Sequence, residues 1–211
     1  MKQLLIIGAR GWGREIYNVL PDCCGYGEDY ICKGFLDDKT DALEGMPGYP
    51  PIIDSAEHYE IQPEDVFICA LGDVHWKKHY VDIILSKGGK FINIIHKSAV
   101  IRRNTEIGVG CIILDHVSIS CDIKVGNFVT FQSYVNVGHD AHIGDFCHLG
   151  CMSFMGGGSE LGDTTVIQIS SIILPHIKVG NDCTVGSGSV VIRNVKSGIT
   201  VFGNPAKKID F

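Results

Sequence analysis

An apolar residue returns at every sixth position over nearly half of this chain. The repeat runs unbroken from Ile95 to Val191, and a glycine often follows the apolar residue, as at Gly126, Gly144 and Gly162. A period of six fits neither an α-helix, at about 3.6 residues per turn, nor a single amphipathic strand, at about two. It fits a coil whose flat faces are each one short strand plus a corner, stacked so that every coil buries the interior of its neighbour. The sequence therefore predicts a parallel β-helix.

The part before the repeat has another pattern. Apolar runs at residues 3–8, 31–36 and 66–71 are typical of buried parallel strands, and residues 11–20 and 74–86 are predicted helices. Trp76 and Tyr80 share one side of the second helix with Val81 and Ile84. Alternating strands and helices predict a small Rossmann-like α/β sheet. We therefore expect three parts: an α/β domain at 1–95, a β-helix domain at 96–197 and a tail at 198–211 that closes or braces the far end.

The repeat also fixes which residues should stack. Three faces of about six residues give about 18 residues per turn, hence roughly five turns between Ile95 and Val191. Residues 18 apart should lie one above the other. The crossover rule for parallel strands, taken alone, predicts right-handed coils.

This stacking points to a candidate catalytic site. It places His139 beneath Gly157 and Asp140 beneath Gly158. A glycine corner has no side chains, so its backbone N–H groups are open to a ligand and could stabilise an oxyanion while His139 removes a proton. Adjacent side chains on an extended strand point to opposite faces, so Asp140 would reach His139 only through the corner geometry. The alternative interpretation is two solvated turn residues.

The histidines of the repeat are candidate metal ligands. A zinc site needs three or four converging ligands, and the repeat holds His116, His139, His142, His148 and His176. Stacking brings no three of them together, so we expect no metal. His148 lies half a coil from His139, on another face of the same chain. Spacing alone favours a surface histidine there, although in a trimer a neighbour's face could bring the two together.

A glycine loop near the N-terminus is the candidate phosphate site. Gly8, Gly11 and Gly13 follow a strand and open a helix, where backbone N–H groups and the helix dipole favour an anion. The spacing is GxxGxG and not the GxGxxG dinucleotide pattern. Asp37 and Asp38, at the end of the next strand, could accept hydrogen bonds from a ribose or a base. The alternative is a tight glycine turn without a ligand.

Composition excludes several classes of protein. The formal net charge of −6 argues against nucleic acid as the main partner. Cys111, Cys147 and Cys183 occupy the small inward position of the repeat, which is typical of buried reduced thiols and a reducing compartment. The first apolar run is too short for a signal peptide, and no segment is long enough to span a membrane. We expect a cytoplasmic protein.

Taken together, these residues resemble the bacterial hexapeptide-repeat acyltransferases that modify nucleotide-linked sugars, the sugar N-acetyltransferases of glycan biosynthesis and the related sialic acid O-acetyltransferases. The resemblance rests on an ordered set of segments: IIGARGWGRE and GFLDDK near the N-terminus, GHDAHIGDFCHLG within the repeat and VFGNPAKKI at the end. It implies a left-handed parallel β-helix, a homotrimer with active sites in the grooves between subunits, and acetyl-CoA as the acyl donor.

The same resemblance implies a role for individual residues. His139 would be the general base and Asp140 its carboxylate partner. The residues implied to contact acetyl-CoA are His148 from the adjoining subunit or face, the Gly157 N–H at the thioester carbonyl, and Lys207 and Lys208 at the phosphates. The residues implied to hold the nucleotide of the sugar are Gly8, Arg10, Gly11, Trp12, Gly13, Asp37 and Asp38.

The function we expect is transfer of an acetyl group from acetyl-CoA to the amine of a nucleotide-linked amino sugar. His139 would assist direct attack, without an acyl-enzyme, because no cysteine lies in an activated setting. Three alternatives stay open: an O-acetyltransferase acting on a sialic acid or other sugar hydroxyl, a non-catalytic trimeric scaffold that binds a nucleotide sugar, and a zinc β-helix hydratase.

Overall fold

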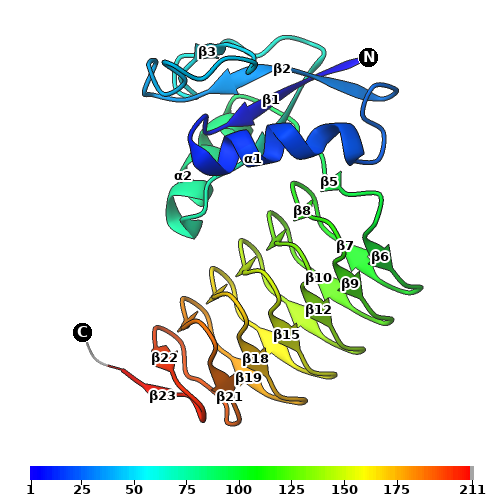
Figure 1. Cartoon of the computed structure of the whole chain (residues 1–211), viewed down its shortest axis with the longest axis vertical. Coiled ribbons are helices and arrows are strands. Elements are labelled where there is room, and N and C mark those ends of the chain that lie inside the picture. The colour runs from blue at the N-terminus through cyan, green and yellow to red at the C-terminus, as the bar shows by residue number, and fades with distance from the viewer. Residues whose placement is uncertain (210–211) are drawn as a thin grey trace. The chain divides into compact units, whose positions relative to one another are not determined.

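The computed structural model describes residues 1–209, so the last two residues of the predicted tail lie outside the described part. The chain divides into two compact units, Met1–His96 and a second unit that begins at Lys97 (Figure 1). Each unit is described by itself.

The first unit is a parallel sheet with helices. Its strands are β1 (Lys2–Ile7), β2 (Tyr30–Leu36), β3 (Ile52–Asp54) and β4 (Asp65–Cys69), in the spatial order β3-β2-β1-β4. Its helices are α1 (Gly11–Val19), the short 3₁₀ helix η1 (Leu20–Asp22) and α2 (Val74–Ser86). Every residue of β4 is buried, as expected for a strand covered on both faces. The predicted α/β organisation is confirmed, and the unit ends with the two-residue strand β5 (Ile94–Ile95).

Two local features fix the helix starts in this unit. Helix α1 begins against the loop that follows β1, where a Cβ at Gly13 would lie 1.8 Å from the carbonyl oxygen of Gly8. Only a hydrogen fits there, so Gly13 allows the close approach. Helix α2 is capped by Asp73, the residue before it, whose carboxylate accepts the backbone N–H groups of His75 and Trp76.

The second unit is a parallel β-helix (Figure 1). Its two-residue strands return every six residues. They are β6 (Val100–Ile101), β7 (Glu106–Ile107), β8 (Ile112–Ile113), β9 (Ser118–Ile119), β10 (Lys124–Val125), β11 (Thr130–Phe131), β12 (Asn136–Val137), β13 (His142–Ile143), β14 (His148–Leu149), β15 (Phe154–Met155), β16 (Glu160–Leu161), β17 (Val166–Ile167), β18 (Ile172–Ile173), β19 (Lys178–Val179), β20 (Thr184–Val185) and β21 (Val190–Val191), followed by β22 (Thr200–Phe202) and β23 (Lys207–Lys208).

These strands make three faces, which we name after a central strand. The β12 face has the order β21-β18-β15-β12-β9-β6, the β13 face has β19-β16-β13-β10-β7, and the β14 face runs β23-β22-β20-β17-β14-β11-β8. From β6 to β21, partners within a face are 18 residues apart, as in the pairing of Val125 with Ile143 and of Ile143 with Leu161. The predicted parallel β-helix and its stacking register are confirmed.

The corners between the faces have left-handed backbone conformations. Within residues 1–209, twelve non-glycine residues have φ between 53° and 63°, among them Asp122, Asp140 and His176. At one corner, a ladder of side chains supports the backbone, because Asp145 accepts the N–H of Asn127 at 2.7 Å and Asp163 accepts the N–H of Asp145 at 2.8 Å. Such side-chain acceptors replace the hydrogen bonds that a sharp corner cannot make with backbone alone.

The period changes after Val191. Val179 pairs with Val195, and Val185 pairs with Val201, so the last coil is two residues shorter than the others. The tail stays attached to the β-helix, since β22 pairs with β20, β23 pairs antiparallel with β22, and the Ala206 N–H donates to the carbonyl of Val190 at 2.8 Å. Strands β22 and β23 therefore extend the β14 face, while the turn between them contacts β21 of the β12 face.

The inward positions of the repeat form the core of the second unit. Cys111, Cys147 and Cys183 are buried there, as the repeat predicted. None of the nine cysteines, all of which lie within residues 1–209, forms a disulfide. In the same residues, no helix combines the length and the apolar character needed to cross a lipid bilayer.

Candidate active site

His139 and Asp140 form a hydrogen-bonded pair at the corner between the β12 face and the β13 face. The imidazole Nδ1 lies 2.6 Å from Oδ2 of Asp140. The left-handed φ of 57° at Asp140 turns the chain, so two adjacent side chains meet instead of pointing to opposite faces. Both side chains are well exposed, at 63% and 65%. With Nδ1–H held by the carboxylate, Nε2 is the nitrogen left to accept a proton.

Gly157 lies directly against the imidazole of His139, one coil further along. A Cβ at Gly157 would come within 2.8 Å of both Cε1 and Nε2 of that ring. The next residue confirms the stacking, because the Gly158 N–H donates to the carbonyl of His139 at 2.8 Å. The Gly157 N–H donates to no acceptor within residues 1–209, which leaves it available to a ligand beside Nε2.

Polar side chains flank this pair along the same corner. One coil before Asp140, Asn104 donates from Nδ2 to Oδ1 of Asp122 at 2.9 Å. This hydrogen bond, a second from Cys121 and the nearby imidazole of His139 lower the pKa of Asp122. One coil after Gly158, the His176 ring would contact a Cβ at that glycine. The Gly157–Gly158 segment is thus bordered by an imidazole on either side.

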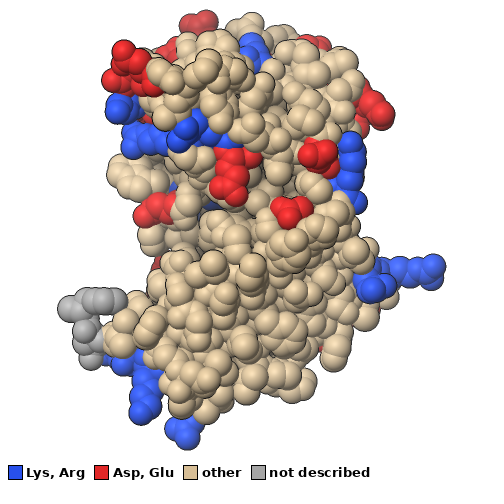
Figure 2. All heavy atoms as spheres, viewed as in Figure 1, with Lys and Arg blue, Asp and Glu red and all other residues tan. Residues whose placement is uncertain are grey.

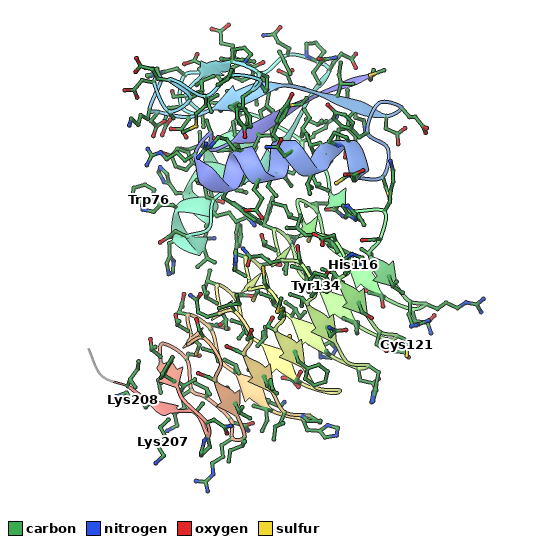
Figure 3. All side chains as sticks on the ribbon, in the orientation of Figure 1. Trp76, His116, Cys121, Tyr134, Lys207 and Lys208 are labelled. Carbon is green, nitrogen blue, oxygen red and sulfur yellow. The ribbon has the colours of Figure 1, made fainter. Side chains whose placement is uncertain are left out.

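The other residues implied to contact acetyl-CoA lie elsewhere on the chain. His148 is half-exposed on β14, between Thr130 and Val166, on the face opposite the corner that carries His139. Lys207 and Lys208 are exposed on β23 of the same β14 face, near the C-terminal end (Figure 3). One chain therefore places His148 and the two lysines on one face and Gly157 with His139 on the corner across from it.

Two buried cysteines are unreactive, and another histidine of the β-helix takes part in a ring stack. Burial raises the pKa of the Cys147 thiol to about 12 and that of Cys69 to about 12, so neither is a thiolate nucleophile at neutral pH. His116 stacks on Tyr134, with ring centroids 4.8 Å apart (Figure 3). Within residues 1–209 no group of three or more His, Cys, Asp or Glu side chains could hold a metal ion.

The glycine loop borders a pocket of about 340 Å³ in the first unit. The pocket is lined by Ile7, Gly8, Arg10, Leu36, Asp37, Asp38, Ala56, Leu71, Gly72, Asp73, Trp76 and Tyr80. Four of the seven residues implied to hold the nucleotide are on this lining. Gly11, Trp12 and Gly13 are not; Gly13 instead faces the carbonyl of Gly8.

The two acidic residues at the end of β2 have different surroundings. Asp37 is nearly buried and accepts the backbone N–H groups of Ala9, at 2.8 Å, and of Lys39, at 2.9 Å. Arg10 lies 3.8 Å from the same carboxylate, with 70% of its side chain exposed. Asp37 therefore holds the glycine loop in place. Asp38 is exposed and accepts a hydrogen bond from the hydroxyl of Tyr80.

Trp76 and Tyr80 are pocket residues that the helical pattern alone did not identify. The pattern grouped them with Val81 and Ile84, which are buried, whereas Trp76 is 59% exposed. Their position was a usable signal, because the first turns of α2 follow the carboxyl end of β4 and such ends carry ligands in open α/β sheets.

Comparison with known proteins identifies both units. Residues 3–84 match the family model described as the PglD N-terminal domain, and residues 158–193 match the bacterial transferase hexapeptide model of six repeats. The chain is a hexapeptide-repeat protein with a PglD-type N-terminal domain. The family resemblance expected from the sequence is thereby confirmed.

Named relatives of this hexapeptide-repeat protein are sugar N-acetyltransferases. It is 27% identical over 118 residues to the UDP-N-acetylbacillosamine N-acetyltransferase of Bacillus subtilis, a match that spans 54% of this chain and only 52% of that protein.

Solved structures share the whole fold. A variant of perosamine N-acetyltransferase from Caulobacter crescentus, with one histidine changed to asparagine and with CoA and GDP-perosamine bound, is 23% identical, with a TM-score of 0.90 over 100% of this chain and 98% of that one. The acetyltransferase domain of PglB from Neisseria gonorrhoeae, with acetyl coenzyme A bound, is 24% identical, with a TM-score of 0.88 over 99% of both chains.

Proposed function

We propose that this hexapeptide-repeat protein is an acetyl-CoA-dependent N-acetyltransferase that acts on a nucleotide-linked amino sugar. The observation that carries the proposal is the His139–Asp140 pair set against the open N–H of Gly157. The relatives support the substrate class, since two are named as sugar N-acetyltransferases and two are solved with CoA or acetyl coenzyme A. The reduced, buried thiols fit the cytoplasmic location that forms part of this proposal.

The geometry suggests a direct transfer. Asp140 holds the Nδ1–H of His139, so Nε2 accepts a proton from the sugar amine as its nitrogen forms a bond to the thioester carbonyl carbon. The carbonyl oxygen gains negative charge, which the Gly157 N–H stabilises by a hydrogen bond. Collapse of this intermediate breaks the carbon–sulfur bond. The departing CoA thiolate then takes the proton from His139, which returns the enzyme to its starting state.

The nucleotide would bind in the pocket of the first unit. Arg10 has most of its guanidinium exposed beside the glycine loop and would pair with the diphosphate. The loop needs Asp37 to keep its shape, which gives that residue a supporting role in place of a direct contact with ribose.

The charge of the β-helix faces supports the homotrimer. Outward residues of the β13 face are mostly charged, and Lys178 pairs with Glu160 at 2.8 Å. Outward residues of the β12 face are uncharged: Val100, Ser118, Asn136, Phe154, Ile172 and Val190. Tyr134 and Met152 are exposed at the corner between the β12 face and the β14 face. Figure 2 shows a broad surface of the β-helix with almost no charged atoms.

Packing of this uncharged surface against a second copy is the arrangement we propose. The β12 face of one subunit would cover the β14 face of the next, and such head-to-tail contacts close into a ring. The ring would bring the neighbour's His148 toward His139, which one chain keeps on opposite sides.

The test is the release of CoA from acetyl-CoA in the presence of single acceptors. The panel holds UDP-, dTDP- and GDP-linked 4-amino sugars, together with the matching 4-hydroxy sugars and sialic acid; thiol from the protein cysteines is subtracted. We expect rapid release with one amino sugar only. Release with only a hydroxyl acceptor would replace the proposal by an O-acetyltransferase. Absence of any acetyl-CoA binding would leave a nucleotide-sugar-binding scaffold.

A further inference from the structure

The pocket of the first unit carries two aromatic rings whose position suits a base. Trp76 and Tyr80 lie one turn apart on α2, with ring centroids 6.2 Å apart and planes inclined by 32°. Trp76 is mostly exposed and projects outward from α2 (Figure 3). An exposed indole at the edge of a pocket is a surface on which a nucleobase can stack.

One carboxylate beside these rings is available for the edge of the base. Both oxygens of Asp37 are occupied by backbone N–H groups, one from Ala9 in the glycine loop and one from Lys39. Asp38 accepts from the Tyr80 hydroxyl through Oδ2, and its Oδ1 accepts from no group within residues 1–209. Burial and the neighbouring Asp38 carboxylate raise the pKa of Tyr80, so its hydroxyl stays protonated and keeps Asp38 in one orientation.

A carboxylate distinguishes bases by what their edges offer. Ionised aspartate only accepts hydrogen bonds. Uracil and thymine present a ring N3–H, and guanine presents a ring N1–H with an amino group beside it. Cytosine and adenine also offer an amino donor, but a bare ring nitrogen replaces the ring N–H beside it, and its lone pair repels the carboxylate.

We propose that Asp38, held by Tyr80, selects a keto base with a ring N–H while Trp76 stacks on that base. The nucleotide would then carry uracil, thymine or guanine in preference to cytosine or adenine. This inference rests on the proposed function, because it takes the pocket as the site of the nucleotide. It goes further by assigning base choice to three side chains that lie outside the glycine loop.

The test compares the binding of free nucleoside diphosphates by titration calorimetry to the full-length protein. UDP and CDP are the critical pair, because they share ribose and diphosphate and differ only in the base edge. We expect UDP, dTDP or GDP to bind about tenfold or more tightly than CDP and ADP. The ratio between UDP and GDP then tells which keto base the pocket holds.

Two variants connect this preference to the named residues. Asp38→Asn supplies both a donor and an acceptor, so the ratio of CDP to UDP dissociation constants should fall about tenfold. Asp82→Asn removes another exposed carboxylate from α2, outside the pocket lining, and should leave that ratio unchanged.

The chain has two tryptophans, so quenching of its fluorescence by UDP should disappear in Trp76→Phe while UDP still binds.

Several results would overturn this inference. Equal affinities for UDP, GDP, CDP and ADP would remove base selection and leave the proposed acetyl transfer intact. An unchanged CDP-to-UDP ratio in Asp38→Asn would remove Asp38 from the role. Binding of none of these nucleotides would overturn both the inference and the nucleotide-linked acceptor.

Discussion

At the scale of single residues, the absence of a side chain at Gly157 leaves the space that the imidazole of His139 occupies. A Cβ there would lie 2.8 Å from Nε2 of the imidazole. Gly157→Ala should displace the ring and lower kcat about 100-fold, because small misplacements of catalytic groups have effects of that size. Circular dichroism should show an intact fold.

A double variant separates this displacement from a general disturbance. If the alanine acts through the imidazole, Gly157→Ala should cause little further loss of kcat in a protein that already carries His139→Ala. Full additivity of the two losses would contradict a direct contact between them.

A second residue-scale feature is the buried carboxylate of Asp65. It accepts hydrogen bonds from Lys33 Nζ at 2.8 Å and from the Tyr59 hydroxyl at 2.7 Å. Burial alone would raise the pKa of Asp65, but the hydrogen bonds from Lys33, Tyr59 and the Gln62 N–H outweigh it and lower the pKa. Because the folded pKa is depressed, the stabilisation is present above the unfolded pKa of about 3.9 and is lost as pH falls through the lower folded pKa.

Asp65→Asn therefore has a defined pH signature. It should reduce the free energy of unfolding at pH 7 by about 1–3 kcal/mol, since the half-buried ammonium of Lys33 loses its charged acceptor. The difference from wild type should shrink as the pH falls below about 4. Urea unfolding at pH 7 and pH 3 measures both. A difference that stays constant across this range would show that the charge of Asp65 does not contribute.

At the scale of elements, two glycines at the start of α1 should behave in opposite ways. Gly13→Ala forces a Cβ onto the Gly8 carbonyl and should destabilise the first unit by about 1–3 kcal/mol. A Cβ at Gly11 meets no atom within 4 Å, so Gly11→Ala should stabilise by about 0.4–1 kcal/mol. Urea denaturation of both variants checks this pair, and equal effects would contradict the close approach.

The six-residue period was enough to predict the strands and the stacking of the β-helix. Apolar side chains must point inward at fixed steps, so the register follows from the pattern itself. The shortened last coil was not predicted, although Val195 and Val201 repeat the period in a frame shifted by two residues. In α2, the helical period could not distinguish residues that line the pocket from residues of the core. The pattern places Trp76 and Tyr80 on the same side of the helix as the buried Val81 and Ile84.

At the scale of the whole molecule, the sequence located His139, Asp140 and Gly157 in one place but not the contact between the first two. That contact depends on the left-handed corner at Asp140, which residue type alone does not fix. The position of His148 on another face than His139 followed from its half-coil spacing. Which subunit would contribute His148 to the site depends on how the chains assemble, and the pattern of one chain does not determine that.

The proposed trimer can be broken by one charge. Phe154 is 41% exposed on the β12 face, so Phe154→Asp should place an unpaired carboxylate in the interface and give particles of one chain, 23.0 kDa, with greatly reduced kcat. Val109→Asp is the control, because it puts the same charge at an exposed corner between β7 and β8, away from the β12 face. Light scattering coupled to size exclusion measures the mass. A single-chain mass for the wild type would contradict the assembly.

Mixing inactive chains tests whether a site is shared. His139→Ala and His148→Ala each remove one contribution from the proposed site. Chains of the two variants, unfolded and refolded together, should recover part of the turnover, because some interfaces then combine both wild-type residues. No recovery in mixed trimers of confirmed composition would place the two histidines in separate roles.

The central claim is that His139 removes a proton during acetyl transfer, and the turnover of His139→Ala with the identified amino sugar tests it most directly. His142→Ala, which removes another exposed histidine three residues away, is the matched control. The account predicts a fall in kcat of about 10²–10⁴ for His139→Ala, with acetyl-CoA still bound and with His142→Ala near wild type. Turnover of His139→Ala close to that of wild type would contradict it.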